Sequence, residues 1–277
     1  MQGKTVVITG ATSGIGEVAA VALARAGARI VMVARDAARA DVTMARLAGQ
    51  GHTVHLADLS RLSEMKRVAA EIAARETRID VLINNAGALF NTREVTEDGL
   101  EKTFATNHLA YFVMTALLLP RLKPTPGARI VSTASDAHRG AKLDFADLQS
   151  ARRYSGFSVY GRSKLMNILF TRELARRLDG SGVTANCLHP GFVATRFGDR
   201  SGGIMSVAIR MAKPFAGLSS EKGAETIIHL ASSPDVANVS GQYFYKRKIA
   251  TPTAEAQDDE SAKRLWDETA KIAGLDI

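Results

Sequence analysis

The feature that most constrains the fold is a strand-like run near the start of the chain, followed directly by a glycine-rich turn and a helical pattern. Residues 5–9 are mostly β-branched and apolar, which is typical of a strand buried on both faces of a parallel sheet. The glycines let backbone amides approach a pyrophosphate, and the helix start that follows favours negative charge. An ordinary tight connection is the alternative, but the flanking strand and helix favour a dinucleotide-binding turn. The residues predicted to form this turn are Thr9, Gly10, Thr12, Ser13, Gly14, Ile15 and Gly16.

Strand-like and helical patterns alternate along the rest of the chain. Strands are predicted over 29–34, 52–57, 79–84, 128–134, 183–188 and 242–245. Helices are predicted over 37–49, 61–75, 96–122 (with a break allowed near Gly99), 157–178 and 221–232, and at the C-terminus. This alternation implies an α/β fold, a Rossmann-type doubly wound parallel sheet with helices on both faces. No repeat or linker interrupts it, so we predict a single domain over residues 1–277.

The composition is that of a globular protein with a sizeable core, since 46% of the 277 residues are hydrophobic. The single cysteine, Cys187, excludes an internal disulfide and fits a reducing compartment. The first predicted strand begins within a few residues of the N-terminus, and no apolar run approaches the roughly 20 residues of a membrane span. We therefore expect a cytoplasmic protein with no membrane span.

The net charge of +8 raises the question of a nucleic-acid partner. The basic residues are scattered and no aromatic residues are interleaved with them, so we expect no nucleic-acid binding. Attraction of an anionic cofactor is a sufficient use of the positive field. Neither an H-E-x-x-H motif nor a Cys/His cluster is present, and we predict no metal site.

Polar residues follow two of the predicted strands. Asp58-Leu59 comes after the third strand, and Asn84-Asn85-Ala86-Gly87 comes after the fourth. In such sheets, ligands bind at the carboxyl ends of the strands. Asp and Asn also cap helices and form turns, and for Asp58 alone both interpretations stay open. The N-N-A-G sequence at this location favours a binding role.

Tyr160 and Lys164 lie four residues apart, hence on one helix face and about 6 Å apart along the axis. A tyrosine titrates at about pH 10, and a nearby positive charge favours its phenolate, which brings it closer to a working acid or base. Ser135 ends a predicted strand, where its hydroxyl can point at a carbonyl or alcohol oxygen. Ser132 is the alternative hydroxyl, and position after the strand favours Ser135.

Taken together, these motifs identify a family. T-G-x-x-x-G-I-G, D-L, N-N-A-G, Asn107, Ser135, Y-x-x-x-K and P-G-x-x-x-T follow one another in the order and spacing of the classical short-chain dehydrogenases/reductases. The resemblance covers essentially the whole chain. Residues 163–178 and 188–191 resemble the retinol dehydrogenase and WW-domain oxidoreductase branch.

The resemblance implies roles for individual residues. Tyr160 would be the acid/base and Ser135 would hydrogen-bond the reacting oxygen. Lys164 would hold the nicotinamide ribose and lower the pKa of the tyrosine, and Asn107 would hold a water in a proton relay to Lys164. The residues that it places along the cofactor, besides the glycine-rich turn, Tyr160 and Lys164, are Asp58, Leu59, Asn85, Ala86, Gly87, Pro190, Gly191, Val193 and Thr195.

The resemblance implies an NAD(P)(H)-dependent oxidoreductase that moves a hydride between nicotinamide and a carbonyl or alcohol carbon. Two alternatives are a catalytically silent NADP(H)-binding sensor or scaffold, and a C=C reductase of the same fold. Because Asn107, Ser135, Tyr160 and Lys164 are all present, catalysis is favoured. The long helices of family members often pair across a dimer, which allows a homo-oligomer.

Cofactor choice is predicted from the end of the second strand. A carboxylate there would select NAD, but the position holds Ala34, and Arg35 follows with a guanidinium that can grip a 2′-phosphate. We expect Asp36 to cap the next helix. Ser13 adds no second positive charge in the turn. We therefore predict a preference for NADP(H), with NAD(H) also accepted.

Residues 204–215 are apolar around most of a short helix, within a segment (195–219) that covers the substrate cleft in the family. Such a cover suits an apolar carbonyl or alcohol substrate, and the alternative is packing on the core or a subunit.

The segment 138–157, which lies between Ser135 and Tyr160, could reshape the pocket rim. We expect His138 and His189 to bond the backbone rather than to catalyse. Leu165, Met166 and Leu169 are predicted to belong to the core or to a subunit face.

Overall fold

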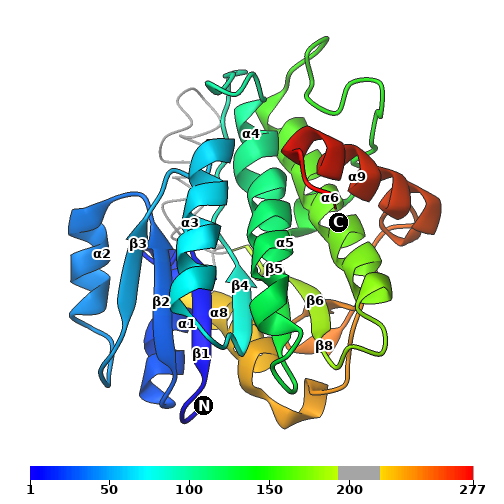
Figure 1. Ribbon diagram of the computed structural model, residues 1–277. Helices are drawn as coiled ribbons and strands as arrows, with labels where there is room; N and C mark the ends of the chain where they lie inside the picture. Colours follow the sequence, from blue (N-terminus) through cyan, green and yellow to red (C-terminus); the bar gives the residue numbers. More distant parts are fainter. Residues whose placement is uncertain (193–218, 277) are drawn as a thin grey trace.

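The computed structural model describes residues 1–192 and 219–276, which form one eight-stranded sheet with helices on both faces (Figure 1). The strand order is β3-β2-β1-β4-β5-β6-β7-β8, and every neighbouring pair is parallel except β7 and β8. This order confirms the predicted doubly wound topology. The strands are β1 (Thr5–Thr9), β2 (Arg29–Ala34), β3 (Thr53–Leu56), β4 (Val81–Asn84), β5 (Arg129–Thr133), β6 (Thr184–His189), β7 (Tyr243–Tyr245) and β8 (Lys248–Ile249).

Helices α3, α5, α6 and α9 cover the face of the sheet that is nearer the viewer in Figure 1, and α1 and α8 cover the other face. A short α4 and a π-helical turn, η1, lead into α5. The helices are α1 (Gly14–Arg25), α2 (Ala37–Met44), α3 (Leu62–Arg75), α4 (Lys102–Phe104), η1 (Ala105–Leu109), α5 (Ala110–Leu122), η2 (Asp136–His138), α6 (Gly156–Arg177), α8 (Ser220–Ser232), η3 (Pro234–Val236), η4 (Glu255–Gln257) and α9 (Asp259–Ala273).

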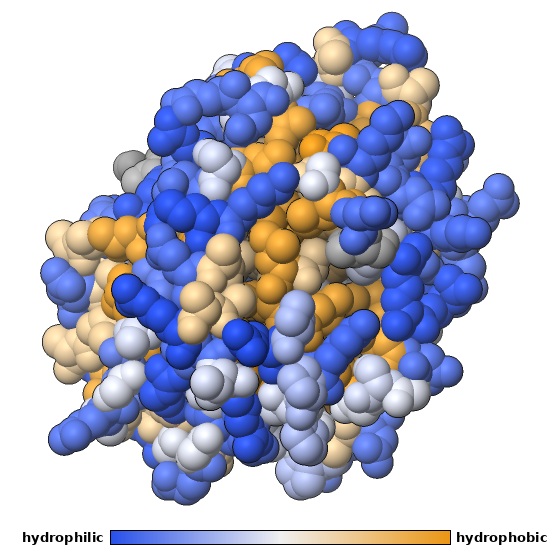
Figure 2. Space-filling model, viewed as in Figure 1, coloured by the Kyte–Doolittle hydropathy of each residue, from blue (hydrophilic) through white to orange (hydrophobic). Residues whose placement is uncertain are grey.

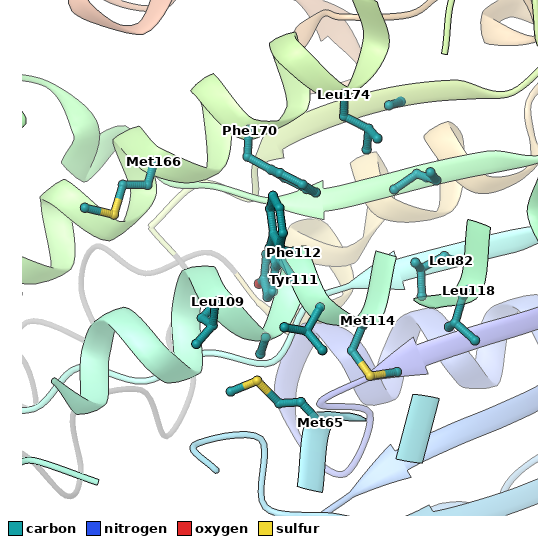
Figure 3. Close-up of a cluster of buried hydrophobic side chains, with 14 of the residues drawn as sticks. Met65, Leu82, Leu109, Tyr111, Phe112, Met114, Leu118, Met166, Phe170 and Leu174 are labelled. Atoms are coloured by element: carbon teal, nitrogen blue, oxygen red, sulfur yellow. The ribbon is translucent and has the colours of Figure 1, made fainter. Parts of the chain in front are cut away.

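Each face of the sheet has its own hydrophobic core. The core beneath α1 and α8 is almost entirely aliphatic, with Phe244 as its one aromatic ring among the fully described buried members. The other core is rich in aromatic and sulfur-containing side chains, and Figure 3 shows Phe112 of α5 pointing toward Phe170 of α6. Leu165, Met166 and Leu169 are buried in this second core, so the expectation of a core role for them is confirmed.

The C-terminal helix α9 packs across α6 and closes this second core. The Trp266 ring lies 4.9 Å from that of Phe112 and stacks on Phe170 at 5.8 Å. The guanidinium of Arg177 lies over the Trp266 ring, 4.5 Å from its centre. The last helix is therefore an integral part of the face that carries α5 and α6.

The surface of this face mixes apolar and charged side chains. Figure 2 shows apolar residues reaching the surface in its middle, surrounded by hydrophilic ones. Among the described residues, no helix combines the length and the apolarity that crossing a membrane requires.

Two predicted helices end or begin differently in the structure. The helix predicted over 96–122 begins only at Lys102, because the Glu101 carboxylate accepts hydrogen bonds from the amides of Thr103 and Phe104, both at 2.7 Å. Gly99, with φ of +75°, forms a turn before it. The helix predicted over 37–49 ends at Met44, and Gly49 has φ of +96°.

Strand β8 has no counterpart among the predicted strands. Tyr245 and Lys248 pair across a two-residue turn in which Lys246 and Arg247 both have positive φ, at +50° and +64°. Such hairpin turns usually hold Asn or Gly, so this sequence carries no hairpin signal.

Candidate active site

The glycine-rich turn lies at the carboxyl end of β1, against the loop that follows β4. A side chain at Gly10 would come within 2.7 Å of the Ala86 Cα atom, so only glycine fits there. The side-chain nitrogen of Asn85, Nδ2, donates to the backbone carbonyls of Thr9 and Gly10, at 3.2 and 3.1 Å. The Thr9 hydroxyl in turn accepts from the backbone amides of Asn85 and Ala86. The Asn85 side chain thus stabilises the glycine-rich turn through hydrogen bonds.

The start of α1 fits the phosphates of a dinucleotide. Ser13 has an extended backbone and makes no side-chain capping bond, which leaves the first amides of the helix available to a ligand. Gly16 allows close packing, since a side chain there would meet the Gly10 carbonyl oxygen at 2.3 Å. Thr12, Gly14 and Ile15 are half-buried at the same turn.

Arg35 follows β2 and is exposed. As expected, Asp36 caps α2, because its carboxylate accepts the amide of Arg39 at 3.1 Å and lies 3.5 Å from the Arg39 guanidinium. Within the described ranges, no acidic side chain forms an ion pair with Arg35. Its side chain is therefore exposed at the carboxyl end of β2, and its contact with a cofactor stays a prediction.

Asp58 has a structural role after β3. Its carboxylate accepts hydrogen bonds from the amide of Ser60 at 3.0 Å and from the Ser60 hydroxyl at 2.9 Å, which fixes the turn before α3. Leu59 beside it is buried. The turn-forming interpretation of Asp58 is confirmed, and its contact with adenine stays a prediction.

Helix α6 carries Tyr160 and Lys164 close to the end of β5. Gly161 permits this approach, since a side chain there would lie 2.5 Å from the Ala137 carbonyl oxygen. The Ser135 side chain hydrogen-bonds to the phenol of Tyr160 and also accepts the amide of Ala137 at 3.2 Å. Ser132 is buried within β5, where its hydroxyl has no partner among the described residues. Ser135, rather than Ser132, is thus placed beside the tyrosine.

Burial dominates the electrostatics of the pair on α6. It raises the pKa of the Tyr160 phenol well above its ordinary range, while the hydrogen bond with Ser135 lowers it. It lowers the pKa of the Lys164 ammonium to about 7. Lys164 Nζ lies 5.5 Å from the centre of the Tyr160 ring and donates to the Thr133 carbonyl at 3.0 Å. Burial therefore outweighs the lowering of the tyrosine pKa that the sequence predicts.

Asn107 lies in the π-helical turn η1, directly behind this pair. Its side chain accepts the amide of Ala88 at 2.8 Å and donates to the Ala88 carbonyl and the Ser163 hydroxyl, at 2.9 and 3.0 Å. The position of a Gly87 side chain would be 3.3 Å from Asn107 Oδ1 and 3.5 Å from Lys164 Nζ. The N-N-A-G loop therefore borders the predicted catalytic residues as well as the glycine-rich turn.

Two contributors to this site were not predicted from the sequence. The Ser163 hydroxyl donates to the Tyr160 carbonyl at 2.7 Å and links it to Asn107. The Thr133 backbone carbonyl holds Lys164. The place of Ser163 between Tyr160 and Lys164 was a usable signal, whereas a backbone carbonyl leaves no mark in a sequence.

Both histidines near the site bond to the backbone, as expected. His138 Nδ1 is 2.7 Å from the Ser135 carbonyl, and its Nε2 accepts the amide of Thr253 at 3.3 Å. His189 Nδ1 accepts the amide of Asp136 at 3.1 Å. Within residues 1–192 and 219–276, no three His, Cys, Asp or Glu side chains gather as metal ligands would.

The loop after β6 is described only in part. Pro190 and the buried Gly191, with φ of +88°, follow the strand. Val193, Thr195 and the predicted substrate cover lie outside the described residues, except for Ser219, which caps α8.

The segment 138–157 holds the loop that follows β4. The Tyr154 hydroxyl donates to the Phe90 carbonyl at 3.0 Å, and the Gln149 side chain accepts the amide of Glu101 at 2.8 Å. A side chain at Gly156 would meet the Phe90 carbonyl at 2.4 Å. Phe157, next in the chain and 56% exposed, stands one helical turn before Tyr160. The segment thus packs against the loop that follows β4, and its effect on the pocket rim stays a prediction.

At the carboxyl ends of the central strands, the structure brings together a hydrogen-bonded Ser–Tyr pair, a buried lysine and a glycine-rich turn that fits a dinucleotide. This combination defines a nicotinamide-dependent oxidoreductase of the Rossmann type. The chain belongs to the short-chain dehydrogenase family, whose model matches residues 4–202.

Its relatives place it in the retinol dehydrogenase branch of that family, as the sequence motifs predict. Human retinol dehydrogenase 13 is 41% identical, with 99% of this chain and 86% of that protein covered. A putative daunorubicin C-13 ketoreductase from Streptomyces sp. (strain C5) is 39% identical, with 99% and 94% covered. A crystal structure of an uncharacterized Mycobacterium paratuberculosis protein, 32% identical, superimposes with a TM-score of 0.81 over 99% of this chain and 95% of that one.

Proposed function

We propose that this protein is an NADP(H)-preferring reductase that converts an apolar ketone or aldehyde to the alcohol, or catalyses the reverse oxidation. The observation that carries the proposal is the Ser135–Tyr160 hydrogen bond beside the buried ammonium of Lys164. The hydroxyls of Ser135 and Tyr160 thus lie together at the carboxyl ends of the strands, where the glycine-rich turn also lies.

The glycine-rich turn and Lys164 would hold a nicotinamide cofactor, which would supply the hydride for the reduction and accept it in the reverse direction. Ser135 holds the substrate oxygen, and Tyr160 donates a proton to that oxygen as negative charge develops on it. Because burial keeps the phenol protonated, the resting site is in the state that reduction requires. The Lys164 ammonium, on the same face of α6, stabilises the phenolate left behind.

The NADP(H) preference rests on Arg35. It stands at the end of β2 without an acidic partner among the described residues, while Asp36 is held by the α2 cap. A guanidinium at this place can bind a phosphate with two parallel hydrogen bonds. The Asp36 carboxylate is engaged by the α2 cap and by Arg39, which makes it less available to ribose hydroxyls.

The preference for an apolar substrate rests on the rim of the site. Phe157 and Phe192 are 56% and 52% exposed, at the start of α6 and after β6, where a ligand would cover them. The relatives' names, retinol dehydrogenase and daunorubicin C-13 ketoreductase, point to large organic substrates in those proteins. Long-chain and polycyclic carbonyl compounds are thus the class to test here.

The test measures NADPH consumption on a panel of long-chain aldehydes, polycyclic ketones, small charged keto acids and α,β-unsaturated ketones, with products identified. We expect kcat/KM to be highest for the apolar saturated carbonyls, and Tyr160→Phe to lower turnover about 10²–10⁴-fold. Preferred turnover of the small charged compounds would contradict the substrate class. Saturation of a C=C bond would indicate a C=C reductase instead. Tight NADPH binding with no turnover on any compound would indicate a silent sensor.

A further inference from the structure

A chain of buried polar side chains runs from α9 to the catalytic lysine. The Thr269 hydroxyl lies 3.0 Å from His108 Nε2, and His108 Nδ1 lies 3.4 Å from Asn167 Oδ1. The Asn167 amide nitrogen is 2.9 Å from the Asn107 carbonyl and 3.4 Å from the Thr133 carbonyl. The Thr133 carbonyl is also the acceptor for Lys164. The chain therefore ends on the atom that holds the lysine.

The bonding partners fix the direction of every hydrogen bond in this chain. The carbonyls of Asn107 and Thr133 can only accept, so the amide nitrogen of Asn167 faces them and its oxygen faces His108. His108 must then carry its hydrogen on Nδ1, which leaves Nε2 to accept from Thr269. All donors point from α9 toward the active site.

The chain is sealed from solvent. Asn167 and Thr269 are fully buried, and His108 is 1% exposed. Burial lowers the pKa of His108 to about 4, so the ring is neutral at physiological pH and keeps the tautomer that the chain requires. Buried polar groups are costly unless paired, and each member of this chain has its partner.

We propose that Asn167 is a positioning residue for Lys164, oriented by His108 and Thr269, which makes α9 part of the support of the active site. The proposal rests on the proposed function. Asn167 shares the Thr133 carbonyl with the lysine and occupies the Asn107 carbonyl beside it. The amide hydrogen on the Thr133 carbonyl thereby limits how strongly that oxygen attracts the ammonium. Lys164 Nζ lies 5.5 and 5.6 Å from the centres of the Tyr160 and Tyr111 rings.

Removing the Asn167 amide takes one competing donor away from the Thr133 carbonyl, which then attracts the Lys164 ammonium more strongly. In Asn167→Leu we therefore expect the pKa of Lys164 to rise from about 7. We also expect kcat to fall about tenfold, because the loss of one hydrogen bond leaves Nζ less well positioned beside Tyr160. In the carbonyl-reduction direction, the limb of the kcat–pH profile that belongs to Lys164 should move to higher pH. Thr269→Val should shift it in the same direction by less, and Thr269→Ser, which keeps the hydroxyl, should restore the wild-type profile.

A second readout needs no activity. Because the folded pKa of Lys164 is below its unfolded value, the unfolding free energy rises with pH from about 7 upward, relative to Lys164→Met. In the Asn167→Leu or Thr269→Val background this rise should begin at higher pH. The matched control is Thr43→Val, which removes an equally buried hydroxyl that bonds only within α2.

The proposal is overturned if folded Asn167→Leu and Thr269→Val keep the wild-type kcat–pH profile and the wild-type rise in stability, or if Thr43→Val shifts them equally. Where Asn167→Leu does not fold, Thr269→Val and Thr269→Ser carry the test. Absence of carbonyl reduction in the wild type would count against the proposed function alone, since the stability readout would still report on Asn167.

Discussion

The two faces of the sheet bury different kinds of side chain. Beneath α1 and α8, the buried hydroxyls of Thr43 and Thr226 bond to backbone groups of their own surroundings and to nothing catalytic. Beneath α5, α6 and α9, buried polar side chains are linked from element to element until they reach Lys164. Because a buried polar group is costly unless paired, a linked series of them on one face indicates where function constrains the sequence.

The largest difference between the faces is expected at Tyr160. Tyr160→Phe removes the transferable proton and should lower kcat about 10²–10⁴-fold, with the fold retained because the ring still fills its place. Lys164→Ala should have a comparable effect. Steady-state kinetics beside thermal unfolding measures both. Near-wild-type kcat in Tyr160→Phe would show that the polar face does not carry the chemistry in this way.

The aliphatic face should respond in the opposite manner. Leu23 of α1 is 1% exposed, and Leu23→Ala should lower the unfolding free energy by about 2–5 kcal/mol through the cavity that it leaves. The kcat of the folded protein should not change. Val42→Ala, at a position 63% exposed, is the control and should cost less than about 0.5 kcal/mol. A loss of kcat in folded Leu23→Ala would mean that the two faces are coupled.

Acid should act on the polar face through His108. Its folded pKa, about 4, lies below its ordinary value of 6.5, so both states are neutral above pH 6.5 and only the unfolded state takes up a proton as the pH falls from there. Stability is therefore lost between pH 6.5 and 4, by up to about 3 kcal/mol. The measurement is urea unfolding of wild type and His108→Gln across this range. The difference between the two proteins removes the contribution of His189, whose pKa is also lowered to about 4. A constant difference would refute the assignment.

The smallest effect is expected at the exposed end of β2. Arg35→Ala should weaken NADP(H) binding about tenfold, as expected for the loss of charge-assisted hydrogen bonds at an exposed site, and should leave NAD(H) binding unchanged. Arg39→Ala is the matched control, because Arg39 is already paired with Asp36. Dissociation constants for both cofactors decide the matter, and equal NADP(H) affinity in Arg35→Ala and wild type would remove the basis for the preference.

The sequence was sufficient for features that depend on local pattern. The buried strands, the glycine-rich turn and the Tyr160–Lys164 spacing are written in neighbouring residues, as is the Asp36 cap. It failed where a single side chain or an unusual backbone decides. The start of α4 at Lys102 depends on the Glu101 carboxylate, and β8 depends on two non-glycine residues with positive φ.

The support of the site could not be predicted for another reason. Asn167 lies three residues after Lys164, but its partners come from η1, β5 and, through His108, α9. These segments meet only in the folded chain. No periodicity or spacing relates Thr269 to Lys164.

The single cysteine offers a reporter of sheet opening. Cys187 lies in β6, between β5 and β7, is 1% exposed, and burial raises the pKa of its thiol to about 12. An alkylating reagent attacks the thiolate, so the native sheet protects this atom both by access and by protonation. Because the chain has no other thiol, the rate of its alkylation measures how often the strands around Cys187 separate.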